Sequence, residues 1–380
     1  MPGANALREK QSRAIEGLVR LVGADHACVG PGHQDLLFRQ VSLPEVSEDA
    51  QHRRMREFDV VVIGGGAAGL AAAVTLSRAR RKVLVVDAGS PRNAAATAVH
   101  SYLGHEGIDP RELLAIGRSE VEQYGGVVRS GTAVGVKRVS ESTLKITLSD
   151  DTTLAARRVL IATGVVDELP DIPQLADRWG RDVLHCAYCH GYEVRDKAIG
   201  LIASGVASLH QAQLWRQWSD KVTLFTNEAV ELTETQRAEF AARQITVVPG
   251  RVTGIEVTDD ELGGIRVGDD AIAVQAAVVF PVSVAKVDDL LAELGLEAER
   301  KEMDGQVIGA TLNADTQVGK TAVPGVWAAG NVRGHRAQVI DAAAQGGLTA
   351  AMMNIDLVEE DVRRAVTGTP FSTEMEREVT

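Results

Sequence analysis

FDVVVIGGGAAG, residues 58–69, decides the fold class of this chain of 380 residues. It opens with the apolar run 58–63, which is typical of a strand buried on both faces of a parallel sheet. A glycine-rich turn follows, then the helix-favouring stretch 70–80 and a second apolar run, KVLVVDAG, at 82–89. This strand–turn–helix–strand order predicts an α/β protein with a dinucleotide-binding unit.

The glycine-rich turn has the spacing that a pyrophosphate requires. Glycines let the turn close and let backbone N–H groups approach the phosphates, while the N-terminus of the following helix adds partial positive charge. Asp87 ends the second strand, where a carboxylate accepts hydrogen bonds from ribose hydroxyls. This spacing does not distinguish FAD from NAD. The turn consists of Gly64, Gly65, Gly66, Ala67, Ala68 and Gly69.

A second strand–helix–strand pattern occurs at 198–204, 206–218 and 221–226. Two such units predict two related nucleotide-binding halves. Short strands are expected between 127 and 160, and a long helix over 339–358.

Cys186 and Cys189 form a C-x-x-C pair directly before the second unit. Two cysteines at this spacing can close a small disulfide loop, and a helix N-terminus stabilises the thiolate. Zinc would need two further ligands at matching spacing, and the sequence has no second such pair, so we expect a redox pair and no metal. His190 follows the second thiol and could move the proton that thiol chemistry releases, although an ordinary surface histidine is the alternative.

Composition narrows the possible partners. The formal net charge of −12 argues against nucleic acid and against anionic membranes. No apolar run approaches the length of about 20 residues that spans a bilayer, and the N-terminus lacks the pattern of a signal peptide. The three cysteines are too few for a secreted disulfide framework. We therefore expect a cytoplasmic location.

Residues 1–56 differ from the rest of the chain. A short amphipathic helix is possible at 7–22, but 29–57 shows no clear period and contains a charged run. We expect an N-terminal extension that is a poorly ordered tail or an arm contacting another subunit, with a cover for the active site as the alternative. Cys28 in this segment is expected to be a bystander thiol.

Several segments, in the same order, resemble the low-molecular-weight thioredoxin reductases. They are the glycine-rich stretch VVIGGGAAGLAAA, the D-x-G-x-x-RN run at 87–93, LIATG at 160–164, the cysteine pair, and WAAGNV with AQV near the end. The resemblance implies two Rossmann-like domains of the three-layer ββα type, the second inserted in the first, with bound FAD and a homodimeric assembly.

The same resemblance sets the expected domain boundaries. Residues 57–171 and 285–360 would form the FAD-binding domain. Residues 172–284 would form the NAD(P)-binding-like domain that carries the cysteines, and 361–380 a C-terminal tail.

Cofactor contacts carry over by position. The glycine-rich turn, Asp87, Arg92 and Asn93 would hold the ADP half and the approach to the flavin, and Thr163 and Gly164 would lie beside it. At the other end, Gly330 and Asn331 would meet the ribityl chain, and the backbone N–H groups of Gln338 and Val339 the pyrimidine edge of the flavin. The family has Asp at position 331, so Asn removes a charge there.

Two departures from the family concern its second ligand and its acid–base group. The second glycine-rich turn begins with Ala203 where the family has Gly, and no arginine follows the next strand to hold a 2′-phosphate. Glu228 there would repel phosphate, so NADPH is doubtful, and NADH or no nicotinamide fits better. His190 replaces the Asp of the reductases. These features resemble the dithiol oxidases of the gliotoxin and holomycin pathways.

Three functions remain open. A dithiol oxidase would oxidise a small-molecule dithiol through the Cys186–Cys189 disulfide, with Cys189 nearer the flavin and oxygen as electron acceptor. A reductase would run the same pair backwards from NAD(P)H to a small redox protein such as thioredoxin. A flavin-binding redox sensor would show no turnover. His100 and His105 could line the substrate pocket or be ordinary loop residues.

Overall fold

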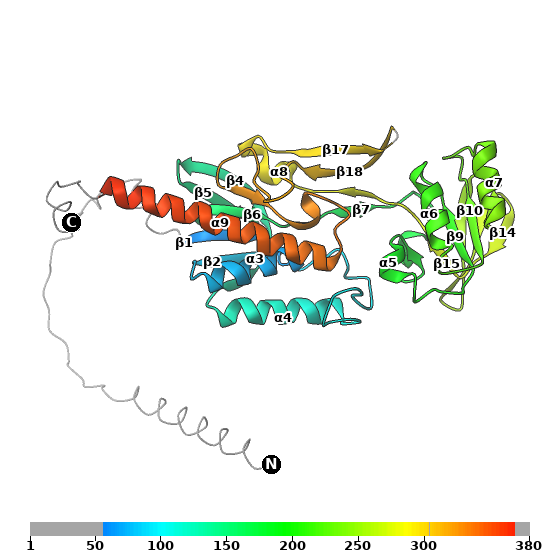
Figure 1. Cartoon of the computed structure of the whole chain (residues 1–380), viewed down its shortest axis with the longest axis horizontal. Helices are drawn as coiled ribbons and strands as arrows, with labels where there is room; N and C mark the ends of the chain where they lie inside the picture. The colour runs from blue at the N-terminus through cyan, green and yellow to red at the C-terminus, as the bar shows by residue number, and fades with distance from the viewer. Residues whose placement is uncertain (1–55, 304, 369–380) are drawn as a thin grey trace, which may run out of the picture. The chain divides into compact units, whose positions relative to one another are not determined.

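The structure, a computed structural model, describes residues 56–303 and 305–368 (Figure 1). The expectations for residues 1–55, including the helix at 7–22 and Cys28, lie outside the described residues.

The first parallel sheet is built on the stretch that opens the dinucleotide unit. β1 (Arg56–Ile63) pairs in parallel with β2 (Val83–Asp87) on one side and with β6 (Thr153–Ile161) on the other. β3 (Val127–Ser130) extends the sheet beyond β2, and the C-terminal half of β6 pairs with β19 (Val326–Ala328). The side chains of Val60, Val61 and Val62 are fully buried, as a central strand with both faces covered requires.

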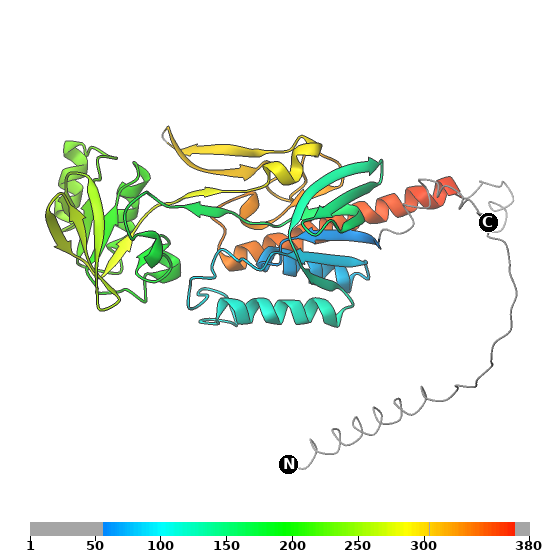
Figure 2. The ribbon, with the colours of Figure 1, turned by 180° about the vertical axis from the view of Figure 1, so that it is seen from behind.

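Different layers cover the two faces of this sheet (Figures 1 and 2). The helices of one layer share a core cluster with Val60 and Val62. On the opposite face, Val61 and Ile63 share a core with two strands that pair antiparallel with each other, and the second of these strands pairs with β6. The result is a helical layer, a parallel sheet and an antiparallel layer. The helices are α3 (Ala67–Arg78), α4 (Pro110–Gln123) and α9 (Val339–Gly368), and the strands are β4 (Ala133–Ser140) and β5 (Thr143–Leu148).

A second parallel sheet repeats the plan within the inserted part of the chain. Its strand order is β11-β10-β9-β15-β8, with β9 in the middle. A three-stranded antiparallel sheet, β12-β13-β14, shares a core cluster with this sheet. The elements of this part are β8 (Val183–Leu184), α5 (Ala187–His190), β9 (Ile199–Ile202), α6 (Ala207–Trp215), β10 (Val222–Phe225), α7 (Glu234–Ala242), β11 (Thr246–Val248), β12 (Val252–Thr258), β13 (Glu261–Val267), β14 (Asp270–Ala273) and β15 (Ala276–Val278).

Two short strands carry the chain between the two parallel sheets. β7 (Val166–Glu168) leads into the inserted part and β16 (Val282–Val284) leads out of it. They pair antiparallel, and β18 (Gln306–Leu312) and β17 (Ala298–Met303) complete a four-stranded sheet. Because β7 and β16 join the two halves, they position the inserted part relative to the first sheet.

The last helix is longer than the sequence predicts. The apolar pattern predicted a helix over 339–358 and a tail from 361, but α9 continues to Gly368. Charged contacts replace apolar ones there: Glu360 is buried against Arg158, and Asp361 pairs with Arg157. The predicted end was wrong because the buried contacts of the last turns are ion pairs and not apolar packing.

Candidate active site and cofactor cavity

The first glycine-rich turn brings β1 and α3 into backbone contact. A Cβ on Gly64, whose φ is +109°, would lie 2.3 Å from the Ala162 carbonyl oxygen, and one on Gly69 would lie 1.9 Å from that of Gly64. At Gly66, which caps α3, a Cβ would meet no protein atom within 4 Å. Two of the glycines therefore close the turn, while the third leaves open space at the start of a helix, where a phosphate binds.

Asp87 lies beside this turn at the end of β2. Its carboxylate accepts hydrogen bonds from the backbone N–H groups of Gly65 and Gly89, both at 3.2 Å, and pairs with Arg118 at 2.8 Å. Burial alone would raise the pKa of Asp87, but the Arg118 and backbone hydrogen bonds outweigh it and lower this pKa. The group is thus an ionised acceptor beside the turn. No sequence pattern pointed to Arg118, because it lies in α4 and reaches Asp87 only in the folded structure.

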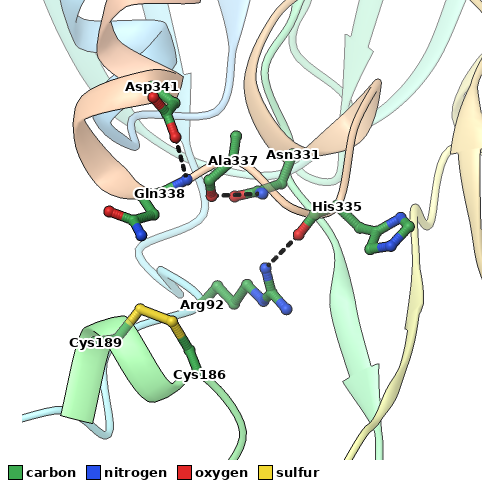
Figure 3. Close-up of a disulfide and its surroundings, with 8 residues drawn as sticks. All are labelled: Arg92, Cys186, Cys189, Asn331, His335, Ala337, Gln338 and Asp341. Carbon is green, nitrogen blue, oxygen red and sulfur yellow. Dashed lines mark hydrogen bonds between the residues drawn. A yellow bond between two sulfur atoms is a disulfide. The ribbon is translucent and has the colours of Figure 1, made fainter. Parts of the chain in front are cut away.

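Cys186 and Cys189 form a disulfide (Figure 3). Cys186 caps α5, and its carbonyl oxygen accepts hydrogen bonds from the backbone N–H groups of Cys189 and His190 at 3.2 Å. The loop closed by the disulfide is therefore the first turn of a short helix, which brings the two sulfurs together.

One cavity of about 1060 Å³ contains both features. The disulfide and the glycine-rich turn line it together, so a ligand held by the turn can reach the sulfurs. Of the site residues predicted from the sequence, Gly69 and His105 do not line this cavity. The sequence-predicted residues that do are Gly64, Gly65, Gly66, Ala67, Ala68, Asp87, Arg92, Asn93, His100, Thr163, Gly164, Cys186, Cys189, His190, Gly330, Asn331, Gln338 and Val339.

His190 is part of a small charged group at the cavity. Burial lowers the pKa of His190. The charge of Glu193 opposes this shift, and the charge of His100 adds to it. His100 in turn lies between two carboxylates, with Nδ1 2.7 Å from Glu106 and Nε2 3.4 Å from Glu193. A neutral imidazole beside the disulfide can accept a proton from an attacking thiol.

The loop before α9 closes another wall of the cavity (Figure 3). The Asn331 side-chain amide donates to the carbonyl oxygens of Ala337 at 3.0 Å and Gly334 at 3.4 Å. The Gln338 N–H, expected to face the flavin, donates to the Asp341 carboxylate at 3.1 Å. In this structure both groups therefore hold the loop together.

Arg92 also makes protein contacts. It forms two hydrogen bonds with Asp167, at 2.7 and 2.6 Å, and donates to Ser283 Oγ and to the His335 carbonyl oxygen. Burial would raise the pKa of Asp167, but the bonds and charge of Arg92 lower it. His185, which stacks on Trp179, has its pKa lowered to about 4 by burial and by the charge of Arg92. No sequence pattern linked Arg92 to Asp167 or His185, because these contacts are tertiary.

The second glycine-rich turn is covered by a side chain. Gln306 Nε2 donates to the Ser204 carbonyl oxygen at 3.3 Å, and a Cβ on Gly205 would lie 1.3 Å from Gln306 Oε1. At the end of β10, Asn227 bonds the Ala203 carbonyl oxygen and the Val252 N–H. Gln306 thus lies on the turn where a second pyrophosphate would bind.

These residues fit a flavin dinucleotide. The open space at Gly66 suits a pyrophosphate, and the ionised Asp87 suits a ribose. The cavity that the turn shares with the disulfide suits an extended ligand. A glycine-rich turn at the end of a parallel strand lines the same cavity as a disulfide. This combination is typical of the nucleotide-dependent disulfide oxidoreductases.

The chain belongs to the pyridine nucleotide-disulphide oxidoreductase family, whose model matches residues 58–347. It is similar to thioredoxin reductase tcpT of Claviceps purpurea, with 30% identity over 319 residues that cover 80% of this chain and 95% of the relative. Among solved structures, HlmI shares 42% identity and a TM-score of 0.75, covering 85% of this chain and 98% of that one. An oxidoreductase from Agrobacterium tumefaciens shares 33% identity and a TM-score of 0.73, covering 80% and 99%.

The comparisons confirm the resemblance, the two-domain α/β fold class and the assignment as an oxidoreductase acting on disulfides. FAD is the cofactor of this family, so that prediction is also confirmed. Among the helices of the described residues, none combines the length and the apolar character needed to cross a membrane.

Proposed function

We propose that this protein oxidises a small-molecule dithiol to a disulfide through Cys186 and Cys189, with FAD as cofactor and oxygen as electron acceptor. One observation carries the proposal: the disulfide shares a cavity with the first glycine-rich turn, while Gln306 covers the second. A reductase needs a nicotinamide at that second turn, where Glu228 also disfavours a 2′-phosphate.

Each residue has a defined task in this reaction. One thiolate of the substrate attacks the disulfide, forms a mixed disulfide with one cysteine and releases the other as a thiolate. The second substrate thiol then attacks the substrate sulfur of this mixed disulfide and releases the first cysteine, so the substrate is oxidised and both cysteines are reduced. His190 accepts a proton from the substrate thiol, and Cys186 lies at the cap of the one-turn helix α5. We assign Cys189 as the thiol nearer the flavin. When bound, FAD would supply the two-electron acceptor for the reduced cysteines, with oxygen as the final acceptor.

The other predicted site residues would bind the cofactor or the substrate. We propose that the glycine-rich turn and Asp87 hold the ADP half of FAD, and that Thr163, Gly164, Gly330 and Asn331 line its flavin half. Val339 and Gln338 would lie at the pyrimidine edge. His100 lies on the cavity wall and is the better candidate than His105 for contact with substrate.

An anaerobic titration of the flavin tests the function. We expect dithiothreitol to bleach the flavin absorbance of the purified protein within seconds, and NADH or NADPH to leave it unchanged over the same time. A Cys186→Ser/Cys189→Ser double variant should retain the yellow colour and lose bleaching. Rapid bleaching by a nicotinamide would instead establish a reductase, and no turnover with any dithiol would favour a redox sensor.

We also propose that two copies of the chain form a cytoplasmic homodimer. The side of α9 opposite its buried face carries an apolar stripe, which a second copy would cover. Its members are Leu348, Ile355, Val358, Val362 and Val366.

A further inference from the structure

In the proposed function the disulfide reacts at the cofactor cavity, yet only β7 and β16 carry the chain into and out of the inserted part. Each has three residues, and Asp167 on β7 lies opposite Ser283 on β16. A crossing this short is where a hinge between two bodies would lie, so other contacts have to fix their positions.

Arg92 bonds both crossing strands at this point. Its Nε and Nη2 donate to the two oxygens of Asp167 at 2.7 and 2.6 Å, and Nη2 also donates to Ser283 Oγ at 3.2 Å. Ser283 Oγ itself donates to Asp167 at 2.6 Å. A guanidinium that binds a carboxylate with two parallel bonds fixes direction as well as distance.

The same arginine ties the strands to the first sheet. Its Nη1 donates to the His335 carbonyl oxygen at 3.1 Å, in the loop that leads into α9 (Figure 3). The contacts are shielded from water, since the side chain of Asp167 is 6% exposed and that of Arg92 22%. Solvent screening of this pair is therefore weak.

The loop that carries Arg92 holds the inserted part at two further points. A Cβ on Gly180 would lie 2.6 Å from Ala95 Cβ, which shows close packing of Ala95 on the segment before β8. Farther along the loop, His100 pairs with Glu193 at 3.4 Å, three residues after His190. These contacts lie before and after the disulfide in the chain.

We propose that Arg92 is a positioning residue: by bonding Asp167 and Ser283, it locks the two crossing strands and holds the Cys186–Cys189 disulfide at the cofactor cavity. It acts through these strands and is not a ligand of the dinucleotide. The expected effect on flavin reduction rests on the proposed function. The locking of β7 and β16 by Arg92 does not depend on it.

The test compares Arg92→Met and Asp167→Asn with the matched control Asp171→Asn, an exposed carboxylate in the segment that follows β7. Three quantities are measured on the FAD-loaded protein: the Kd of FAD, the distance distribution from small-angle X-ray scattering, and the rate of anaerobic flavin reduction by dithiothreitol. Ser283→Ala, which leaves no buried charge unpaired, serves if the charge variants do not fold.

We expect Arg92→Met and Asp167→Asn to bind FAD with a Kd within about threefold of the parent, to broaden the distance distribution and to slow flavin reduction about 100-fold, the effect of misplacing reacting groups by roughly 1 Å. Arg92→Lys should restore little, because it cannot form the paired bonds. Asp171→Asn should match the parent.

Other results would overturn the lock. Loss of FAD binding in Arg92→Met with an unchanged distance distribution would make Arg92 a cofactor ligand. An unchanged distribution with an unchanged reduction rate would show that Arg92 positions nothing. If dithiols fail to reduce the parent flavin while the variants still broaden the distribution, the proposed function fails and the lock stands.

Discussion

At the scale of single residues, His190 is the group that we propose for proton transfer at the thiol pair. It follows Cys189 and lines the same cavity as the disulfide. Burial lowers its pKa below the ordinary value of 6.5, against the opposing charge of Glu193. The imidazole is consequently neutral at pH 7, which is the form that accepts a proton from a thiol before attack.

Dithiol oxidation should therefore lose rate as the pH falls through the lowered pKa of His190, because the protonated ring cannot accept a further proton. We expect His190→Gln to lower kcat/KM about 100-fold or more and to remove this acid limb. The profile is measured as oxygen uptake between pH 4.5 and 8. His105→Gln, at a residue that does not line the cavity, is the control, and an acid limb that persists in His190→Gln would assign the proton to another group.

At the scale of secondary structure, α9 lines the cavity at its start and packs against the first sheet along its length. Val339 at its start lines the cavity, and Gly346 lets it approach α3, since a Cβ there would lie 2.0 Å from the Ala68 carbonyl oxygen. Its last turns are held by charge: Glu360 lies 2.6 Å from Arg158, 3.3 Å from Arg157 and 2.5 Å from Arg364. A buried carboxylate with several guanidinium partners ties this end of the helix to β6.

Replacing Glu360 with Gln should lower the free energy of unfolding by about 1–3 kcal/mol, because buried guanidinium groups lose a charged acceptor. Arg158 still pairs with Asp356, and Arg157 still pairs with Asp361. The loss of stability is therefore smaller than if both guanidinium groups had no carboxylate partner. Urea unfolding measures the change. Glu359→Gln, one residue earlier and exposed, should be neutral, and an equal loss in both variants would show that the buried pairs contribute nothing.

At the scale of the whole molecule, the apolar stripe on α9 bears on assembly. The buried residues of the helix, among them Ala350, Met353 and Leu357, face α3 and the sheet. The stripe lies on the other side and extends over several turns, which is more apolar surface than one isolated exposed side chain would present. A second copy of the chain would remove this surface from water.

We expect the parent protein to sediment as a dimer at micromolar concentration, and an Ile355→Asp/Val362→Asp double variant to sediment as a monomer, because two buried carboxylates would face an apolar partner. Val257→Asp on β12 replaces another exposed valine and should leave the dimer intact. Analytical ultracentrifugation separates these outcomes, and a dimeric double variant would place the interface elsewhere.

The sequence alone determined the fold class, the first nucleotide turn and the redox pair, because each depends on local order: glycines at fixed spacing between a strand and a helix, and two cysteines three positions apart. It also predicted a weak second nucleotide site, from Ala203 and Glu228. Only the tertiary structure decided which distant groups meet. The bonds of Arg92 to Asp167, the cover of Gln306 on the second turn and the ionic end of α9 join segments far apart in the chain, and no local periodicity encodes such contacts.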